Sequence, residues 1–317
     1  MARVQISRSL STLSLILIRL WTSHFPVLGH GFVHSVLIDD QAYTGWNPFN
    51  DPYFSPPPSR VIRKVQSDGF GTLSKNDPDL PCHHDGESGS TAVAEVNAGS
   101  TVVFQWSYVR HTGYETFNLP YERPCWRADH QGPVSTYMTS CNGDCSSFMV
   151  TGARWFKIDA GGYDQSTRQW AADKLRADNN SWTSIVPAGL MPGQYLMRNE
   201  IVALHSGASN SQHYPACLQL NVRGSGKGYP SEGDYVSIPG LYDNVAFPNI
   251  YGNFGSFPPP GPSPVTLDER NPPFTITATP SSTAGTAATP IGTRRPGGNP
   301  LNNDGEGVCR LVSRKRT

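Results

Sequence analysis

Apolar and polar residues alternate over short stretches in the middle of the chain, and this pattern predicts β-strands separated by turns. The strand-like runs are residues 31–38, 91–96, 100–107, 155–159, 194–203 and 217–222. The turn-forming triplet Asn97-Ala98-Gly99 joins two of them, and only residues 146–152 suggest a short helix. Without regular helices between the strands, we expect an all-β fold, an immunoglobulin-like or fibronectin-like antiparallel β-sandwich with long loops.

Two further stretches, residues 41–89 and 159–182, read mainly as long loops, where binding sites are commonly built. The composition changes at residue 257, since residues 257–300 contain 11 Pro and 11 Ser or Thr. Such a segment is typical of an extended linker. We therefore expect one sandwich domain at 30–256, a linker at 257–300 and a disordered tail at 301–317.

The first 29 residues have the features of an export signal. Arg3 and Arg8 precede a short apolar run, and Val27 and Gly29 supply the small residues that signal peptidase prefers. The alternative is a hydrophobic N-terminal helix of an intracellular protein. Cleavage after Gly29 predicts a secreted, extracellular protein whose mature chain begins at His30.

Composition and charge exclude several classes of protein. The 317 residues include 25 basic and 25 acidic side chains, so no basic excess is present to bind nucleic acid. The N-terminal apolar run is too short for a permanent membrane helix. With 37% hydrophobic residues, the chain can bury a core. We expect a monomer that binds neither nucleic acid nor membrane.

Cysteine usage agrees with export. Six cysteines occur without any C-x-x-C pair, which excludes zinc-ribbon and thioredoxin-like sites and leaves 15 pairings open. Cys141 and Cys145 enclose a turn-forming triplet, so a local bridge is plausible there. Asn179-Asn180-Ser181 is a glycosylation sequon, which predicts a glycan on Asn179.

An N-terminal histidine would be a chelating unit, because its amine and imidazole Nδ1 can hold one metal ion together. A second imidazole completes a planar set of three nitrogens, which suits Cu(II). The free amine has a pKa of about 7.7–8.0, low enough for copper to displace its proton at neutral pH. His30 is therefore a candidate copper ligand.

Several ordered motifs strengthen this hypothesis. They are His30-Gly31, residues 43–48 (YTGWNP), Pro52-Tyr53 before three prolines, His130-Gln131-Gly132-Pro133-Val134, residues 155–158 (WFKI), 192–205 (PGQYLMRNEIVALH) and 212–217 (QHYPAC). Together they resemble the fungal lytic polysaccharide monooxygenases of Auxiliary Activity family 9. The resemblance covers about residues 30–255.

The resemblance implies a site with one copper ion per chain. His30 and His130 would be the equatorial ligands and Tyr214 the axial one. His205 and Gln212 would form hydrogen bonds that orient the oxygen co-substrate next to the copper, so His205, Gln212 and Tyr214 are the expected catalytic residues.

For function, the resemblance implies oxidative cleavage of cellulose or a related β-glucan. Copper reduced by an external electron donor would use O2 or H2O2 to abstract hydrogen at C1 or C4 of a sugar. Tyr43, Trp46 and Tyr251 are candidates for stacking on the polymer, with Tyr251 the best placed near the end of the domain. The implied disulfides are Cys82–Cys217 and Cys141–Cys145.

The chain departs from the family pattern between Trp106 and His130. The 23 residues from 107 to 129 exceed the usual connection and carry Cys125, which has no family partner. They represent an added loop or retained intron sequence, and Cys125 either pairs with Cys309 or leaves two free thiols. The tail contains no recognisable cellulose-binding module.

Simpler interpretations remain for individual residues. His130 and Tyr214 could be ordinary core residues, His205 and Gln212 a buried pair, and Tyr43 and Trp46 loop packing. We interpret His34, His83, His84, His111 and His213 as surface histidines. The alternative function is copper or carbohydrate binding by a β-sandwich without oxygenase activity.

Overall fold

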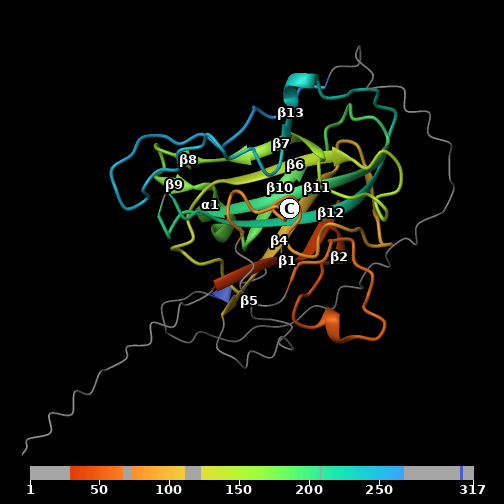
Figure 1. Cartoon of the computed structure of the whole chain (residues 1–317), viewed down its shortest axis with the longest axis horizontal. Helices are drawn as coiled ribbons and strands as arrows, with labels where there is room; N and C mark the ends of the chain where they lie inside the picture. Colours follow the sequence, from red (N-terminus) through yellow and green to blue (C-terminus); the bar gives the residue numbers. More distant parts are fainter. Residues whose placement is uncertain (1–28, 67–72, 111–122, 208, 268–307, 310–317) are drawn as a thin grey trace, which may run out of the picture.

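The computed structural model describes residues 29–66, 73–110, 123–207, 209–267 and 308–309. Its strands form two principal sheets, of four and six strands (Figure 1). The first has the order β10 (Ser181–Ile185), β4 (Thr101–Arg110), β1 (Gly29–Ile38), β2 (Gln41–Thr44). The second has the order β13 (Tyr235–Ser237), β7 (Arg154–Gly161), β6 (Val134–Ser140), β11 (Gly193–Ala203), β12 (Gln212–Arg223), β3 (Ala94–Asn97). The two sheets pack as a β-sandwich, which confirms the expected fold class.

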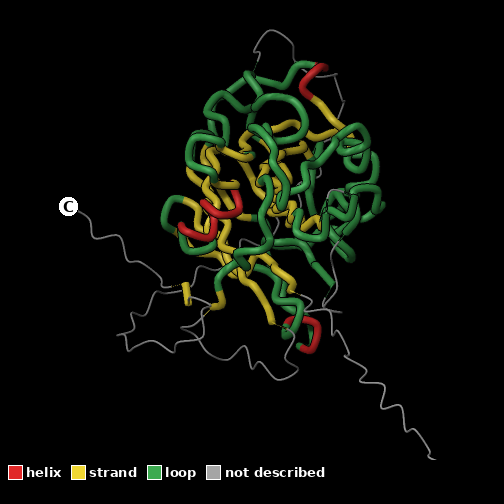
Figure 2. The backbone as a smooth tube through the Cα atoms, turned by 90° about the vertical axis from the view of Figure 1, so that its left-hand side faces the viewer, coloured by secondary structure: helices red, strands yellow, loops and turns green. Residues whose placement is uncertain are grey.

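The remaining elements are short and lie around the sandwich. They are β5 (Arg123–Pro124) paired with β14 (Val308–Cys309), β8 (Tyr163–Asp164) paired with β9 (Gln169–Trp170), α1 (Ala171–Ala177) and the 3-10 helices η1 (Asp51–Tyr53) and η2 (Glu232–Asp234). Figure 2 shows the strands in the interior with loops wrapped around them. None of the helices in the described residues is long and apolar enough to cross a membrane.

The core has two parts because the six-stranded sheet is covered on both faces. Between the sheets, Val102, Phe104 and Trp106 on alternate positions of β4 are buried, as the alternating pattern predicts. A second cluster, which includes Leu73, Leu80 and Cys82, packs the loop after β2 against the six-stranded sheet. Most of β11 and β6 is consequently buried on both faces.

Most predicted strands are confirmed, and the predicted helix is corrected. Residues 146–152 form turns, whereas the one α-helix of the described chain is α1. The predicted turn at 97–99 does join β3 to β4, and it crosses from one sheet to the other, because β3 pairs with β12 and β4 pairs with β1. The β3–β12 pair is parallel.

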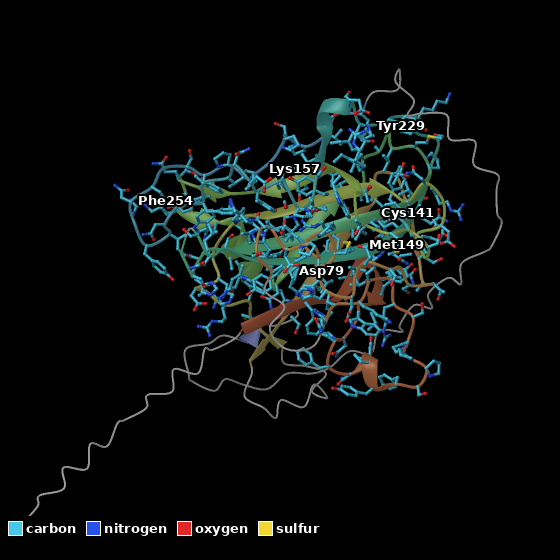
Figure 3. All side chains as sticks on the ribbon, in the orientation of Figure 1. Asp79, Cys141, Met149, Lys157, Tyr229 and Phe254 are labelled. Atoms are coloured by element: carbon cyan, nitrogen blue, oxygen red, sulfur yellow. A yellow bond between two sulfur atoms is a disulfide. The ribbon has the colours of Figure 1, made fainter. Side chains whose placement is uncertain are left out.

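Two disulfides brace the sandwich, and both match the pairing that the family resemblance implies. Cys82 is bonded to Cys217, which ties the long loop to β12, and Cys141 is bonded to Cys145. Figure 3 shows Cys141 at one end of the molecule and Phe254, on the loop that precedes residue 257, at the other.

The stretch predicted as linker begins with a packed segment. The carbonyl of Pro260 accepts hydrogen bonds from the Tyr137 hydroxyl (3.2 Å) and from Lys157 Nζ (2.7 Å), and Val265 N donates to the Lys157 carbonyl. The first part of the predicted linker, residues 257–267, therefore packs against the sandwich. Residues 1–28 and 268–307, where the export signal and most of the linker are predicted, lie outside the described residues, as does the tail apart from 308–309.

Candidate metal centre

The ends of three adjacent strands bring the predicted site residues together. His130 precedes β6, His205 follows β11, and Gln212 and Tyr214 open β12. Val134 of β6 pairs with Ile201 of β11, and Ile201 pairs in turn with Tyr214. Because the three strand ends meet at one edge of the sheet, residues far apart in sequence converge.

His130 is held on several sides. Its ring stacks on that of His205, with centroids 3.9 Å apart and an angle of 18° between the planes. The indole of Trp126 meets it edge to face at 6.0 Å. Nδ1 is 2.8 Å from Asp129 Oδ1. Burial, with a smaller effect of His205, lowers the pKa of His130 to about 4. The imidazole is therefore neutral near pH 7, as a metal ligand must be.

Tyr214 and Gln212 form the second part of the cluster. Tyr214 is buried, and its hydroxyl donates a hydrogen bond of 2.8 Å to Gln212 Oε1. Gln212 Nε2 donates a hydrogen bond of 3.2 Å to Oγ of Ser206, the residue that follows His205. The rings of Tyr214 and His130 lie 6.3 Å apart. The structure thus gathers His130, His205, Gln212 and Tyr214 in one place.

The start of β1 lies against this cluster through Trp126. A Cβ atom on Gly31 would come within 2.2 Å of Trp126 Cζ3, so the indole occupies the space that a side chain at position 31 would need. The same indole donates from Nε1 to the His130 carbonyl (3.1 Å) and meets Tyr214 edge to face. The backbone of His30 pairs with Val109 in β4; its side chain lies outside the described residues.

Two observations fit a copper ion held by this set. His205 Nδ1 is buried and has no hydrogen-bond partner in the part of the chain that the structure describes, so a polar group is available at the site. The contact with Asp129 makes Nδ1 of His130 the hydrogen-bond donor, so the lone pair of the neutral ring that could bind a metal lies on Nε2. Neutral imidazole nitrogens are donors that suit Cu(II).

The three aromatic residues predicted to stack on the polymer differ in how exposed their rings are. Tyr251 is 71% exposed, and its hydroxyl donates to the His205 carbonyl at 3.1 Å, so the ring lies on the surface beside the cluster. Tyr43 and Trp46 are buried in the core, and Trp46 Nε1 donates to the Val65 carbonyl. Their burial favours the alternative of packing within the fold, and stacking of these two rings on sugars stays a prediction.

Residues 30–256 match the model of Auxiliary Activity family 9, formerly GH61. The chain belongs to this family. An AA9 family lytic polysaccharide monooxygenase B of Gloeophyllum trabeum is 38% identical over 251 residues, which cover 75% of this chain and 91% of the relative.

A further relative and two solved structures support the assignment. A lytic polysaccharide monooxygenase A of Malbranchea cinnamomea is 34% identical over 245 residues, covering 75% of this chain and 68% of the relative. The extended catalytic domain of H. jecorina LPMO9A superposes with a TM-score of 0.63 and 31% identity, over 82% of this chain and 98% of that domain. The structure of a cellulose-active polysaccharide monooxygenase from M. thermophila superposes with a TM-score of 0.60 and 30% identity. The match covers 75% of this chain and 100% of that one.

Three residues that touch His130 were missed as site residues by sequence reasoning. Trp126, Asp129 and the neighbouring Arg127 all fall in the stretch that departs from the family pattern. The only signal for them in the sequence was that they lie close to His130 along the chain. Within that stretch β4 continues to Arg110, Cys125 is disulfide-bonded, and residues 111–122 lie outside the described residues. The alternative in which Cys125 is a free thiol is therefore wrong.

The other histidines are not all at the surface. His213 is fully buried, with Nδ1 2.9 Å from Glu200 Oε1, and His83 is largely buried as well. Half-buried His84 lies near Asp77 and Asp79, with its Nδ1 2.5 Å from Asp79 Oδ2. His111 lies outside the described residues. Asn179, the predicted glycosylation site, is half-buried in a left-handed turn before β10.

Proposed function

We propose that the chain is a secreted, copper-dependent lytic polysaccharide monooxygenase that cleaves cellulose or a related β-glucan. The observation that carries this proposal is the buried, neutral His130 stacked on His205, beside Tyr214 and the start of β1. Membership of Auxiliary Activity family 9 supports the same activity. The Gloeophyllum and Malbranchea relatives are both named lytic polysaccharide monooxygenases.

His30 would hold copper through its amine and Nδ1, His130 through Nε2 and Tyr214 through its hydroxyl. When bound, the copper supplies one-electron chemistry that lets O2 or H2O2, with an external electron donor, oxidise C1 or C4 of a sugar. The other contributions come from the protein's own side chains. His130 and Tyr214 are buried, so the protein itself limits the access of water to both groups.

We infer that His205 forms a hydrogen bond with the oxygen co-substrate. Its Nδ1 has no partner among the described residues, and burial lowers the pKa of its imidazole. A neutral imidazole can donate one hydrogen bond and accept another. Gln212 positions the Tyr214 hydroxyl through a 2.8 Å hydrogen bond. Tyr251 presents an exposed ring on which a glucan chain could stack beside these groups.

The decisive test is incubation of the mature protein with cellulose, copper and a reductant, followed by detection of oxidised oligosaccharides. We expect product from the wild type and none from His30→Ala or His130→Ala. His84→Ala is the matched control, because this half-buried histidine pairs with Asp79 away from the cluster. If His30→Ala released as much oxidised product as the wild type, the proposed mechanism would be wrong.

Sequencing the N-terminus of the secreted protein provides a second test. The amine ligand exists only if the mature chain begins at His30, so any other start overturns the copper site proposed here. Tight copper binding without oxidised sugars would instead favour the alternative of a copper-binding β-sandwich. Adsorption to cellulose that is indifferent to copper, again without oxidised products, would favour a carbohydrate-binding module.

A further inference from the structure

The residue immediately before His130 makes a direct contact with its imidazole. Asp129 Oδ1 lies 2.8 Å from His130 Nδ1. The carboxylate is itself fixed by Arg127, whose Nε donates to Oδ1 at 2.8 Å and whose Nη2 donates to Oδ2 at 2.5 Å. This two-point contact sets the plane of the carboxylate, since guanidinium and carboxylate match as a fork.

The contact decides which nitrogen of His130 carries the hydrogen. An ionised carboxylate can only accept hydrogen bonds, so Nδ1 must be the donor. A neutral imidazole has a single N–H group, and the lone pair therefore lies on Nε2. Nε2 is therefore the nitrogen that can donate its lone pair to a metal.

The packing around the ring preserves this orientation. His130 is only 3% exposed, one face is covered by His205, and the Trp126 indole meets the ring edge to face. A rotation that exchanged the two nitrogens would have to displace these neighbours. The hydrogen bond to Asp129 and the packing together hold the ring in one orientation.

We propose that Asp129 is a positioning residue that presents His130 Nε2 to the copper and makes the imidazole a stronger electron donor. Arg127 holds the carboxylate in place for this task. A carboxylate behind a ligating histidine raises the basicity of the ligand. Stronger donation favours Cu(II) over Cu(I), so Asp129 lowers the reduction potential of the site. The inference rests on the copper site proposed above.

The test compares Asp129→Ala and Asp129→Asn in the mature full-length protein, with copper alone as the probe. Titration calorimetry gives the Kd for Cu(II), electron paramagnetic resonance gives the spectrum of the site, and redox titration gives its potential. For Asp129→Ala we expect Cu(II) to bind about 10- to 100-fold more weakly. If Cu(I) affinity is unchanged, each tenfold loss raises the potential by about 59 mV.

Asp129→Asn should show a smaller shift in the same direction, because an amide oxygen still accepts a hydrogen bond but carries no charge. Asp129→Glu provides a rescue variant in which the charge is retained. Asp79→Asn is the matched control, since Asp79 makes a similar 2.5 Å contact with His84 Nδ1 outside the site. It should leave the copper spectrum and potential unchanged.

The outcomes separate this inference from the proposed function. If the wild type binds copper and both Asp129→Ala and Asp129→Asn keep its Kd, spectrum and potential, the role of Asp129 is refuted while the copper site stands. If the wild type with His30 at its N-terminus binds no copper, both proposals fail. Equal shifts in Asp79→Asn would also overturn the inference, because the effect would not belong to His130.

Discussion

The imidazole of His205 lies nearly parallel to that of His130, with ring centroids 3.9 Å apart. His205 follows β11 and His130 precedes β6, so the contact joins two adjacent strands of the six-stranded sheet. Burial is the main cause that lowers the pKa of both imidazoles, and the two rings therefore stack as neutral groups. The stack covers one face of His130. It also places beside it the Nδ1 of His205, which has no hydrogen-bond partner among the described residues.

Replacing His205 separates its packing role from its polar role. His205→Phe retains a ring against His130 but removes Nδ1, so we expect copper binding to persist while release of oxidised oligosaccharides falls by about 10- to 100-fold. Calorimetry and chromatography of the products measure the two quantities. His84→Phe is a matched control outside the cluster. Full activity in His205→Phe would show that Nδ1 is not needed.

Tyr251 and Trp46 allow surface stacking to be distinguished from core packing. Tyr251→Ala removes a ring that is 71% exposed, so cellulose adsorption should weaken several-fold with little change in thermal stability. Tyr251→Phe should retain most of the adsorption, because it loses only the hydrogen bond to the His205 carbonyl. Adsorption isotherms without reductant measure this effect.

Trp46→Phe should give the opposite result. It leaves adsorption intact but lowers the free energy of unfolding by about 1–3 kcal/mol, because the buried Val65 carbonyl loses its hydrogen bond. Denaturant unfolding measures the loss. Weakened adsorption by Trp46→Phe, or unchanged adsorption by Tyr251→Ala, would contradict this division.

The C-terminal boundary of the folded unit can be tested by truncation. A chain ending at residue 256 loses the Pro260 carbonyl that accepts hydrogen bonds from Tyr137 and Lys157. Burial already lowers the pKa of Lys157 to about 8, so its ammonium depends on this acceptor. We expect about 1–3 kcal/mol less stability than in a chain ending at residue 267. Equal denaturation midpoints for the two truncated chains would show that residues 257–267 contribute nothing.

Sequence reasoning was most successful where a strand has one buried face. Strands β1 and β4 alternate in sequence, and both lie at the predicted places. Strand β6 escaped notice because nearly all of it is buried, so its sequence VSTYMTS carries no clear period. The helix was misplaced because α1 has only seven residues, too few to show a periodic pattern.

Only those residues of the candidate site that lie in recognisable motifs could be predicted from the sequence. The motifs supplied His130, His205, Gln212 and Tyr214, and the structure brings them together. Burial was not predictable: Tyr43 and Trp46 are aromatic like Tyr251, and only the three-dimensional packing shows that they lie in the core. Asp129 was missed because its role depends on the orientation of a neighbouring ring.

The cysteine count predicts a third bond. Cys82–Cys217 and Cys141–Cys145 use four of the six cysteines, and Cys125 is disulfide-bonded too. In a single chain the remaining partner is Cys309, whose strand β14 pairs with β5 just before Cys125. Peptide mapping without reduction should find the two peptides joined. Alkylation of a free Cys309 thiol would contradict the pairing, and absence of the Cys125 peptide would indicate that this stretch is not in the mature protein.

The buried carboxylate of Glu200 should make stability depend on pH. Glu200 is fully buried and accepts hydrogen bonds from Arg198 Nη1 (2.7 Å), from the Tyr242 hydroxyl and, on its other oxygen, from His213 Nδ1 (2.9 Å). Burial alone would raise the pKa of this carboxyl, but Arg198 and His213 outweigh burial and hold it well below its usual value of 4.5.

A carboxyl whose pKa is lower in the folded than in the unfolded state stabilises the fold above the unfolded pKa. Glu200 should therefore contribute its full stabilisation above about pH 5 and lose it progressively as the pH falls below 4.5. Glu200→Gln should cost about 3–5 kcal/mol near pH 7, because Arg198 is left buried without its counter-charge. The difference in unfolding free energy between wild type and variant should shrink from pH 5 towards pH 3. A constant difference over that range would show that Glu200 does not titrate with an altered pKa.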